Sequence, residues 1–397
     1  MNAAVQLQPA RARRLKIAQV ATSDISVRLL LLEQIEALSG AGHEVIAVCS
    51  ASEHADAIRK RGIAVESVPM TREPGIRDAA SLLALVRCFR RSQFDVVHTH
   101  TPKAGLLGPL AARLAGVPVI VHTIHGLLLH DSQPRWRRAL GWFPEKVTSM
   151  LSHRLLSQSE EDLRVAREMK LSGEKITYLG NGVDIGRFHS PSAAERAAAR
   201  RALGLNPNEF AVGSVGRLVY EKGFAELFSA AAQIKSRYPF VRFFVVGPDE
   251  PDQRDAIPRH LVSELAERGQ VEFLGWRDDM ASFYAALDLF VLPSHREGIP
   301  RACMEAASCG LPVIASNIRG CREVVRDSES GLLFPVKNSE ALAEAIAKLI
   351  SDRQRAQQMG ANGRRHIVQQ FDERQVLGRL CSFYEELAEE IPARERQ

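Results

Sequence analysis

Residues 297–315, EGIPRACMEAASCGLPVIA, constrain the fold of this 397-residue chain most strongly. They follow the apolar run at 287–293, which predicts a buried strand. Gly298 and Pro300 then indicate a turn and the first position of a helix. A glycine and a proline end that helix, and 313–315 predicts the next strand. The unit is therefore strand, loop, helix, strand.

The loop and the helix of this unit each carry one glutamate, Glu297 and Glu305. In an open parallel sheet, ligands bind beyond the carboxyl ends of the strands, and the free amides of a helix start attract anions. Carboxylates accept hydrogen bonds from sugar and ribose hydroxyls. We predict that the two glutamates flank an anion site. The alternative is a surface loop with two solvated glutamates, because the spacing alone is a weak signal.

Apolar strand-like segments alternate with helical ones along most of the chain, which implies parallel βαβ units and an α/β fold class. A proline-containing, Ala/Arg-rich segment interrupts this rhythm and predicts an interdomain linker at 191–208. We expect a disordered leader at 1–14, a Rossmann-like domain at 15–190, a second one at 209–370 and a C-terminal helix in 371–397. The predicted strands are 15–20, 44–49, 65–69, 95–100, 117–123, 155–158, 176–179, 211–215, 243–246, 271–273, 287–292, 313–315 and 331–334.

Two cations, Arg217 and Lys222, stand in a glycine-bounded loop after the predicted strand at 211–215. Arginine binds phosphate as a planar fork and lysine as a point charge, so the pair suits a diphosphate. A solvated surface is the alternative for such a pair. No Asp-x-Asp motif stands at a strand end, so we predict no metal site, and the paired cations would balance the diphosphate charge.

Composition excludes several other classes. The net charge of +5 is too small for a nucleic-acid-binding protein without a concentrated basic patch. The six cysteines are far apart and form no Cys-x-x-Cys, which is typical of buried thiols in a reduced cytoplasmic protein. No apolar run is long enough to span a membrane, and the first residues lack the apolar region of a signal peptide.

A dinucleotide-binding enzyme would share this architecture, but its glycine fingerprint is absent. That fingerprint, Gly-x-Gly-x-x-Gly, directly follows the first strand. Here the turn reads Thr22-Ser23-Asp24, and the Gly180-Asn181-Gly182 sequence has the wrong spacing. A nicotinamide oxidoreductase is therefore disfavoured.

The two motifs together resemble the signature of glycosyltransferase family 4, the retaining nucleotide-sugar transferases of GT-B fold. The resemblance covers nearly the whole chain. It implies two Rossmann-like domains facing across a cleft, with the C-terminal helix crossing back to the first domain. The residues that carry it are Gly216, Arg217, Leu218, Lys222, Gly223, Glu297, Gly298, Ile299, Pro300, Glu305, Ala306 and 310–314.

The resemblance implies a role for each residue of the donor site. Arg217 and Lys222 would neutralise the departing nucleoside diphosphate. Glu305 would bind the ribose, and Glu297 the donor sugar. A nucleophilic role for Glu297, as in retaining glycosidases, is disfavoured against front-face attack. The implied donor-binding residues are Gly216, Arg217, Lys222, Glu297, Gly298, Ile299, Pro300 and Glu305, with neither cofactor nor metal.

The first domain carries a second group of candidates. His125, after the strand at 117–123, resembles the family histidine near the transferred sugar and joins Arg217, Lys222 and Glu297 as a predicted catalytic residue. His100 and Lys103 are predicted to bind the acceptor. The alternatives are a structural histidine, a solvated Lys103, and a metal site at His98, His100 and His122.

The acceptor is the least constrained part. Thr22-Ser23-Asp24 replaces a glycine pair found in many family members, and subgroups that extend lipid-linked oligosaccharides resemble this chain there and at 100–105. Residues 135–144 mix arginine and tryptophan, which favours an anionic membrane surface, although an ordinary helix with exposed arginines is the alternative.

We therefore expect a peripheral enzyme at the cytoplasmic face of the membrane. It would move a hexose or N-acetylhexosamine from a UDP-sugar to a polyprenyl-diphosphate-linked saccharide, in cell-surface polysaccharide or glycan biosynthesis. The alternatives are a nucleotide-sugar epimerase or phosphorylase of the same fold, or a non-catalytic nucleotide-sugar-binding protein. We expect no nucleic-acid partner.

Overall fold

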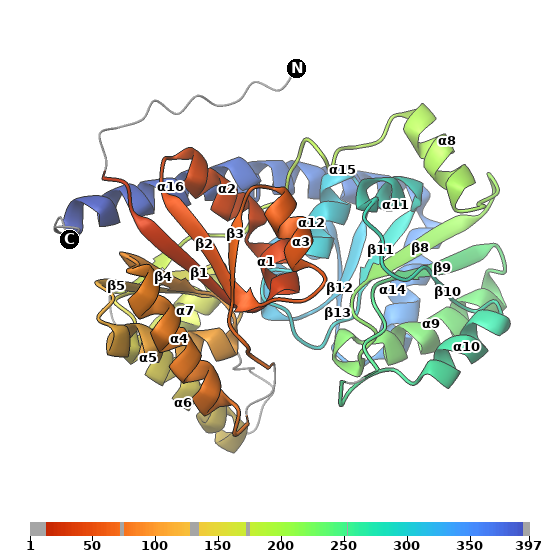
Figure 1. Ribbon diagram of the computed structural model, residues 1–397. Coiled ribbons are helices and arrows are strands. Elements are labelled where there is room, and N and C mark those ends of the chain that lie inside the picture. The colour runs from red at the N-terminus through yellow and green to blue at the C-terminus, as the bar shows by residue number, and fades with distance from the viewer. Residues whose placement is uncertain (1–12, 72–74, 128–134, 172–174, 252, 392–397) are drawn as a thin grey trace. The chain divides into compact units, whose positions relative to one another are not determined.

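The computed structural model describes residues 13–71, 75–127, 135–171, 175–251 and 253–391, and the side chains of 135–140 are not described. The chain divides into two compact units (Figure 1). Unit 1 comprises Met1–Gly180 with Gln375–Gln397, and unit 2 comprises Asn181–Arg374. Most of the predicted leader lies outside the described residues. Its end is ordered, because Arg13 pairs with Asp95 at 3.2 Å and donates to the Ile391 carbonyl at 2.9 Å.

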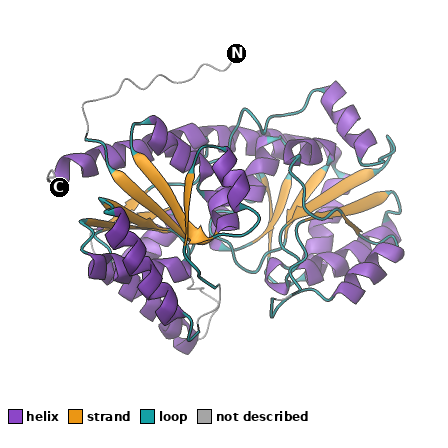
Figure 2. Cartoon of the chain, in the orientation of Figure 1, coloured by secondary structure: helices purple, strands orange, loops and turns teal. Residues whose placement is uncertain are grey.

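Unit 1 is built on a parallel sheet with strand order β3-β2-β1-β4-β5-β6-β7. Figure 2 shows helices on both sides of this sheet. The strands are β1 Lys16–Ser23, β2 Glu44–Ser50, β3 Ala64–Ser67, β4 Val96–Thr99, β5 Val119–Ile124, β6 Arg154–Ser157 and β7 Ile176–Tyr178. The helices are α1 Asp24–Leu30, α2 Leu32–Gly40, α3 Ala55–Lys60, α4 Asp78–Ser92, α5 Pro102–Ala115, α6 Arg135–Leu151 and α7 Glu160–Glu168.

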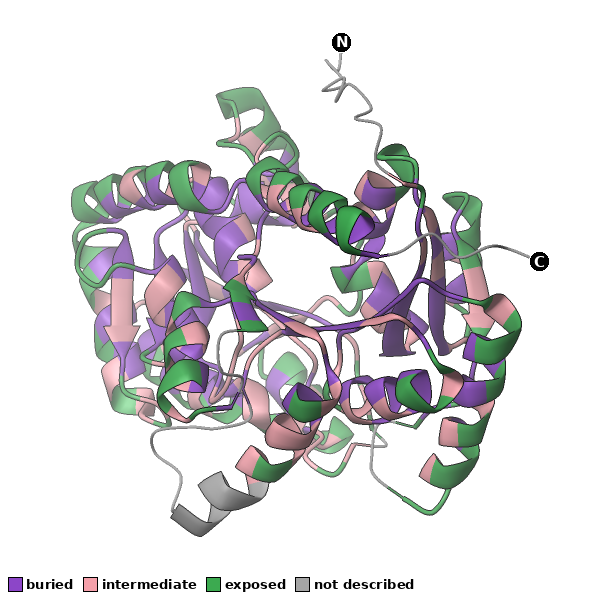
Figure 3. Ribbon diagram, turned by 90° about the vertical axis from the view of Figure 1, so that its left-hand side faces the viewer, coloured by how far each residue is buried: buried purple, intermediate pink, exposed green. Residues whose placement is uncertain are grey.

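Alternate residues of β1 pack into two different cores. Ile17 joins the core under α1 and α2, whereas Ala18 and Val20 join the core under α4 and α5. Successive side chains of a strand point to opposite faces, so a strand covered on both faces must be apolar throughout. That is why these strands read as continuous apolar runs. Figure 3 shows most strand residues buried and the helices exposed along their outer faces.

Unit 2 repeats the plan with strand order β10-β9-β8-β11-β12-β13, again parallel. Its strands are β8 Phe210–Val215, β9 Val241–Val246, β10 Glu272–Phe273, β11 Leu289–Leu292, β12 Val313–Ser316 and β13 Gly331–Phe334. Its helices are α8 Ala193–Ala202, the short 3-10 helix η2 Tyr220–Lys222, α9 Phe224–Arg237, α10 Arg259–Glu267, α11 Met280–Ala286, α12 Arg301–Ser308, α13 Arg319–Val324, α14 Ser339–Ser351 and α15 Arg353–Gln370.

Each sheet reverses its strand order once, between β1 and β4 in unit 1 and between β8 and β11 in unit 2. Ligands of open α/β sheets bind at such switch points, beyond the carboxyl ends of the strands. The predicted site residues follow these strands or their neighbours. All the predicted strands are present within the described residues, so the prediction of an α/β protein with two parallel-sheet, Rossmann-like domains is confirmed.

The segment predicted as a linker, 191–208, differs from that prediction because α8 is an integral part of unit 2. Ser192 caps the helix through a capping box with Glu195. Arg196 and Arg200 then pair with Asp288 at 2.7 and 3.0 Å. These contacts fix α8 against the start of β11. The units consequently meet in sequence at Gly180 and Asn181, ten residues before the predicted boundary.

The last helix, α16 Glu373–Glu390, packs on unit 1 (Figure 1). Val376, Leu380, Tyr384 and Leu387 are buried and join the same core as Ile17. Their spacing of four, four and three residues places them on one helical face. The predicted return of the C-terminal helix to the first domain is therefore confirmed.

Candidate functional site

The loop after β8 begins with Gly216 and Arg217, and it lies against the loop after β9. Gly247 at the end of β9 has φ +153, and a Cβ added there would lie 1.8 Å from the Gly216 carbonyl oxygen. Only glycine fits both the dihedral angle and the space. The close approach brings the backbone around Gly216 and Arg217 to the carboxyl edge of the sheet.

Lys222 and Glu297 meet directly, although they stand on different loops. The Lys222 ammonium lies 2.5 Å from Glu297 Oε1, and the Ser294 hydroxyl donates to the same oxygen at 2.7 Å. Gly223 makes this possible, because its φ is +72 and a Cβ would lie 2.0 Å from the Pro293 carbonyl oxygen. The side chains are 20 % and 15 % exposed, so the pair lies at the surface edge of the unit.

Arg217 also has an acidic partner. Its guanidinium lies 2.9 Å from a Glu250 carboxylate oxygen, and the two side chains are 30 % and 25 % exposed. Both predicted phosphate-binding cations therefore hold a carboxylate in the structure. A diphosphate oxygen offers the same kind of charge-assisted acceptor as a carboxylate. An anionic ligand can therefore bind these two cations by replacing their carboxylate partners.

Glu305 lies in a separate polar cluster on α12. The Tyr284 hydroxyl donates to Oε2 at 2.9 Å, and Arg301 lies 3.2 Å from Oε1. The carboxylate side chain is 13 % exposed. Burial raises the pKa of Glu305 above its usual value, while the nearby Arg301 guanidinium and Tyr284 hydroxyl lower it.

The remaining predicted donor residues form the turn into α12. The Gly298 carbonyl packs against Gly320, where a Cβ would lie 1.2 Å away. Ile299 is buried, and Pro300 is the N-cap. The helix therefore starts at Arg301, one residue later than predicted. Unit 2 brings Gly216, Lys222 and Glu297 to the β8 and β11 ends, as the sequence predicts.

In unit 1, His125 follows β5 and contacts His100 beyond β4. His125 Nε2 lies 3.1 Å from His100 Nδ1, and Gln158 hydrogen-bonds the His125 side chain. Burial lowers the pKa of His125 to about 4 and holds the pKa of His100 well below its usual range. Both rings are therefore neutral near pH 7.

The other two histidines of the proposed metal alternative have hydrogen-bond partners of their own. His98 lies 2.8 Å from the Tyr384 hydroxyl and 2.7 Å from Thr123 Oγ1, while His122 Nδ1 lies 2.8 Å from Thr99 Oγ1. Within the part of the chain that the structure describes, no three His, Cys, Asp or Glu side chains are grouped as metal ligands would be. These contacts favour a hydrogen-bonding role for both histidines.

Lys103 is not the solvated lysine of the alternative interpretation. Its ammonium lies 2.6 Å from Asp78 and 3.1 Å from Thr71 Oγ1, and the side chain is 7 % exposed. The side chain thus links the start of α5 to the start of α4. An acceptor phosphate would have to displace Asp78 to reach it.

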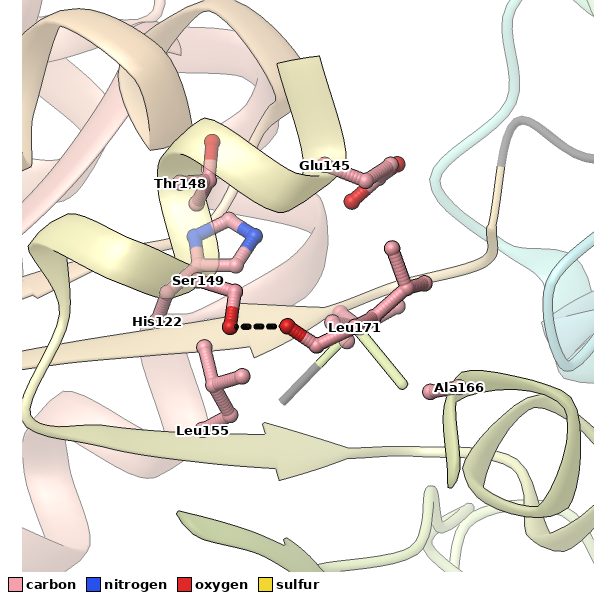
Figure 4. Close-up of a pocket in the computed structure, with 8 residues that line it drawn as sticks. His122, Glu145, Thr148, Ser149, Leu155, Ala166 and Leu171 are labelled. Atoms are coloured by element: carbon pink, nitrogen blue, oxygen red, sulfur yellow. Dashed lines mark hydrogen bonds between the residues drawn. The ribbon is translucent and has the colours of Figure 1, made fainter. Parts of the chain in front are cut away.

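A small cavity lies elsewhere in unit 1 (Figure 4). His122, Thr148 and Ser149 line it, together with apolar side chains, and Ser149 donates to the Leu171 carbonyl at 2.6 Å. None of the predicted catalytic, donor-binding or acceptor-binding residues lines this cavity.

Sequence reasoning missed the partners of the predicted residues. Glu250 and Tyr284 contact Arg217 and Glu305, and Gln19 and Tyr384 contact the histidines. Glu250 follows β9 in an acidic loop with no motif to mark it. Gln19 and Tyr384 are polar residues within apolar patterns, a signal that was available and was not used.

Family models match both units. The model described as "Glycosyl transferases group 1" matches residues 195–366, and that described as "Glycosyltransferase Family 4" matches residues 28–187. Their boundary coincides with the start of α8.

Two curated relatives and one solved structure are similar over most of the chain. A UDP-Gal:alpha-D-GlcNAc-diphosphoundecaprenol alpha-1,3-galactosyltransferase of Escherichia coli is 32% identical, covering 75% of this chain and 76% of the relative. An N,N'-diacetylbacillosaminyl-diphospho-undecaprenol alpha-1,3-N-acetylgalactosaminyltransferase of Campylobacter jejuni is 23% identical, covering 90% and 95%. The structure of Anabaena HepE in complex with UDP and glucose matches with a TM-score of 0.78 and 23% identity, covering 94% of this chain and 100% of that one.

Proposed function

The chain belongs to the family 4 glycosyltransferases of GT-B fold, and from that premise we propose the reaction, its substrates and its place in the cell. The enzyme transfers a hexose or N-acetylhexosamine from a UDP-sugar to a polyprenyl-diphosphate-linked saccharide, in the biosynthesis of a cell-surface polysaccharide or glycan. The names of both curated relatives support the acceptor, and the first supports the UDP-sugar donor.

The observation that carries this proposal is the pairing of Lys222 with Glu297 at the switch point of the second sheet. A transferase that breaks a sugar–phosphate bond needs a cation for the departing diphosphate and an acceptor for sugar hydroxyls. The loop after β8 supplies the cation, Lys222, and the loop after β11 supplies the acceptor, Glu297, 2.5 Å away. When a donor binds, its phosphate takes the place of the carboxylate at Lys222, and Glu297 is released to a sugar hydroxyl.

Arg217 and Glu305 would complete donor binding. Arg217 exchanges Glu250 for a phosphate oxygen, and the leaving charge is stabilised by two fixed cations. Glu305 is held by Tyr284 and Arg301, and its two oxygens carry further lone pairs that would accept from the ribose hydroxyls.

Stereochemical retention proceeds by front-face attack in this proposal. Glu297 Oε1 accepts from Ser294, and in the proposed donor complex the carboxylate also accepts from a sugar hydroxyl, which reduces its nucleophilicity. A second carboxylate is needed as acid and base in a double displacement, and Glu305 is engaged by Tyr284 and Arg301. The departing phosphate therefore takes the acceptor's proton. His125 in unit 1 contacts the transferred sugar as a neutral hydrogen-bonding group.

A lipid-linked acceptor supports a location of the enzyme at the cytoplasmic face of the membrane, which is part of this proposal. Helix α6 presents Phe143 and Met150 to solvent, each 66% exposed, and Lys146 lies on the same helix. Apolar side chains beside a cation suit an anionic lipid surface. Among the helices of the described residues, none has both the length and the apolarity needed to cross a bilayer.

The first test is donor binding. Thermal-shift measurements with UDP, UDP-glucose, UDP-galactose, UDP-N-acetylhexosamines and a GDP-sugar would identify the nucleotide, because a ligand of the folded state raises the melting temperature by mass action. The expected result is a rise with UDP and one class of UDP-sugar that disappears in Glu305→Ala. A protein without any nucleotide-dependent shift would contradict the proposal.

The second test separates transfer from the alternatives. The purified enzyme, a UDP-sugar and a polyprenyl-diphosphate saccharide should give a lengthened lipid-linked product and UDP. An epimerase would interconvert the UDP-sugar without acceptor, a phosphorylase would consume inorganic phosphate, and a binding protein would shift its melting temperature without turnover.

A further inference from the structure

A buried polar chain runs through the core of unit 1 and ends at His125. It starts on the C-terminal helix at Tyr384 and continues through Gln19 on β1 and His100 beyond β4. All three side chains are at most 2 % exposed. Burying so many polar atoms is costly unless each finds a partner. The proposed reaction gives no role to any of these three residues.

The first link joins the helix to the sheet. The Gln19 amide nitrogen donates to the Tyr384 hydroxyl at 3.4 Å, and the Gln19 amide oxygen lies in a short contact with His100 Nε2. A carbonyl oxygen only accepts, so His100 Nε2 carries the proton. His100 is neutral, and its Nδ1 therefore has a lone pair.

The second link reaches His125. His100 Nδ1 accepts, so the proton between the two rings belongs to His125 Nε2, 3.1 Å away. His125 is also neutral, because burial lowers its pKa to about 4. One proton on Nε2 leaves Nδ1 as the acceptor atom of the ring. The Gln158 side chain also hydrogen-bonds this ring and raises the pKa of His125, as an acceptor of a ring N–H does. Acceptance of an Nδ1 proton by Gln158 would give the opposite tautomer, so Gln158 is the competing influence.

A second branch of hydrogen bonds leads from Tyr384 to His98 and Thr123, and its donors also point away from Gln19. Tyr384 accepts from Gln19 and so donates its own proton to His98 Nδ1, 2.8 Å away. His98 Nε2 then donates to Thr123 Oγ1 at 2.7 Å. Every donor in these five contacts thus meets one acceptor, and reversing one bond would require reversing all of them.

We propose that Tyr384 is a positioning residue for His125: through Gln19 and His100 it fixes the His125 proton on Nε2 and leaves Nδ1 to accept. This rests on the proposed function only for its catalytic consequence. His125 Nδ1 then accepts a hydrogen bond from a sugar hydroxyl and has no proton to donate. The C-terminal helix thereby becomes part of the acceptor-side machinery.

The direct readout is the tautomer of His125. Long-range proton–nitrogen correlation spectra of the full-length protein with ¹⁵N-labelled histidine distinguish protonated from unprotonated ring nitrogens, and His125→Gln assigns the signals. The expected wild-type spectrum has His125 protonated on Nε2. A wild-type His125 protonated on Nδ1 would overturn the inference.

Tyr384→Phe tests the coupling. It removes only the hydroxyl, so Gln19 and His98 each lose a partner, and the His125 signals should become those of a tautomer mixture. Leu387→Ala is the matched control, because Leu387 lies in the same helix and core without a polar contact. It should lower the melting temperature and leave His125 unchanged. Unchanged His125 signals in Tyr384→Phe would also overturn the inference.

Gln19→Glu covers the case in which Tyr384→Phe does not fold. A carboxylate accepts from both neighbours, so His125 should keep its proton on Nε2 while Tyr384 reverses and His98 becomes protonated on Nδ1. An unaltered His98 would contradict the chain.

In the transfer assay, Tyr384→Phe should lower kcat about tenfold, roughly the value of one hydrogen bond, with the donor KM little changed. A kcat equal to that of the wild type would count against positioning. Absence of transfer in the wild type would contradict the proposed function but not this inference, because the spectra test the tautomer independently.

Discussion

Lys222 and Glu297 form an ion pair, so each charge neutralises the other in the absence of a ligand. Their contact of 2.5 Å is reinforced by Ser294. Two further residues, Arg217 and Glu250, repeat the arrangement at 2.9 Å. In the proposed donor site, a nucleotide sugar would therefore compete with two carboxylates for the two cations, and its affinity would depend on Glu250 as well as on the residues that contact it.

Lys222→Met removes the cation proposed to balance the leaving diphosphate. We expect kcat to fall about 10²–10³-fold, which is typical for the loss of one preorganised charge-stabilising group. The measurement is UDP release in the presence of acceptor. Lys235→Met is the control, since Lys235 lies on α9 and bonds only the Gly269 carbonyl. Equal activity of both variants would exclude the leaving-group role of Lys222.

Glu250→Gln should have the opposite effect on binding. It keeps the shape of the side chain but releases Arg217 from a carboxylate, and a partly exposed pair is worth under about 1 kcal/mol. The Kd for UDP should therefore decrease about threefold to fivefold in titration calorimetry. Asp249→Asn, next in sequence and paired with Arg259, should leave the Kd unchanged. Weaker UDP binding in Glu250→Gln would show that Glu250 is a ligand contact.

At the scale of elements, the ends of β4 and β5 concentrate neutral histidines. Burial lowers the pKa of His122 to about 3 and of His125 to about 4, and it holds the pKa of His98 and His100 well below the usual value of 6.5. In the unfolded chain these groups bind protons near pH 6.5. Their contribution to stability is therefore fully present above that pH and is lost as the pH falls toward 4.

The difference between the histidine pKa values in the folded and unfolded chain predicts that β4 and β5 become less stable as the pH falls. Each such histidine lowers the free energy of unfolding by about 1.4 kcal/mol per pH unit below pH 6. Native-state hydrogen exchange, corrected for the intrinsic rate, should show less protection of the β4 and β5 amides at pH 5 than at pH 7. His122→Gln should reduce this pH dependence, and His260→Gln, an exposed residue of α10, should not. Equal protection at both pH values would contradict the assignment of neutral histidines.

The elements themselves were predictable because they depend on local chemistry. Apolar runs bounded by glycine and proline identified the strands from β1 to β13, and the motifs placed Lys222 and Glu297 at neighbouring strand ends. The carboxylate partners were not predictable. Whether Arg217 meets Glu250, or Lys103 meets Asp78, depends on loop conformations that bring residues 33 and 25 positions apart within 3 Å. The prediction that 191–208 is a linker was wrong for a related reason. The contact that fixes α8 joins Arg196 to Asp288, which lies far from it in the sequence.

At the scale of the whole molecule, the chain leaves unit 1 at Gly180 and returns to it at Gln375. Unit 1 is thus completed by residues that follow unit 2 in the chain. Its core includes Val376, Leu380, Tyr384 and Leu387 from α16, all at most 4 % exposed. Each large apolar side chain of this kind contributes about 1.5–3 kcal/mol through burial.

A chain that ends at Arg374 should therefore lose unit 1 and keep unit 2. The free energy lost with α16 is of the order of a domain's whole stability, about 5–15 kcal/mol, so unit 1 should lack a cooperative transition. Calorimetry should show one thermal transition instead of two, and UDP should still raise it, because the proposed donor residues lie between 181 and 374. Adding a peptide of residues 375–391 is the control, and it should restore the second transition at sufficient concentration. Two transitions in the shortened chain would show that α16 is an accessory to unit 1.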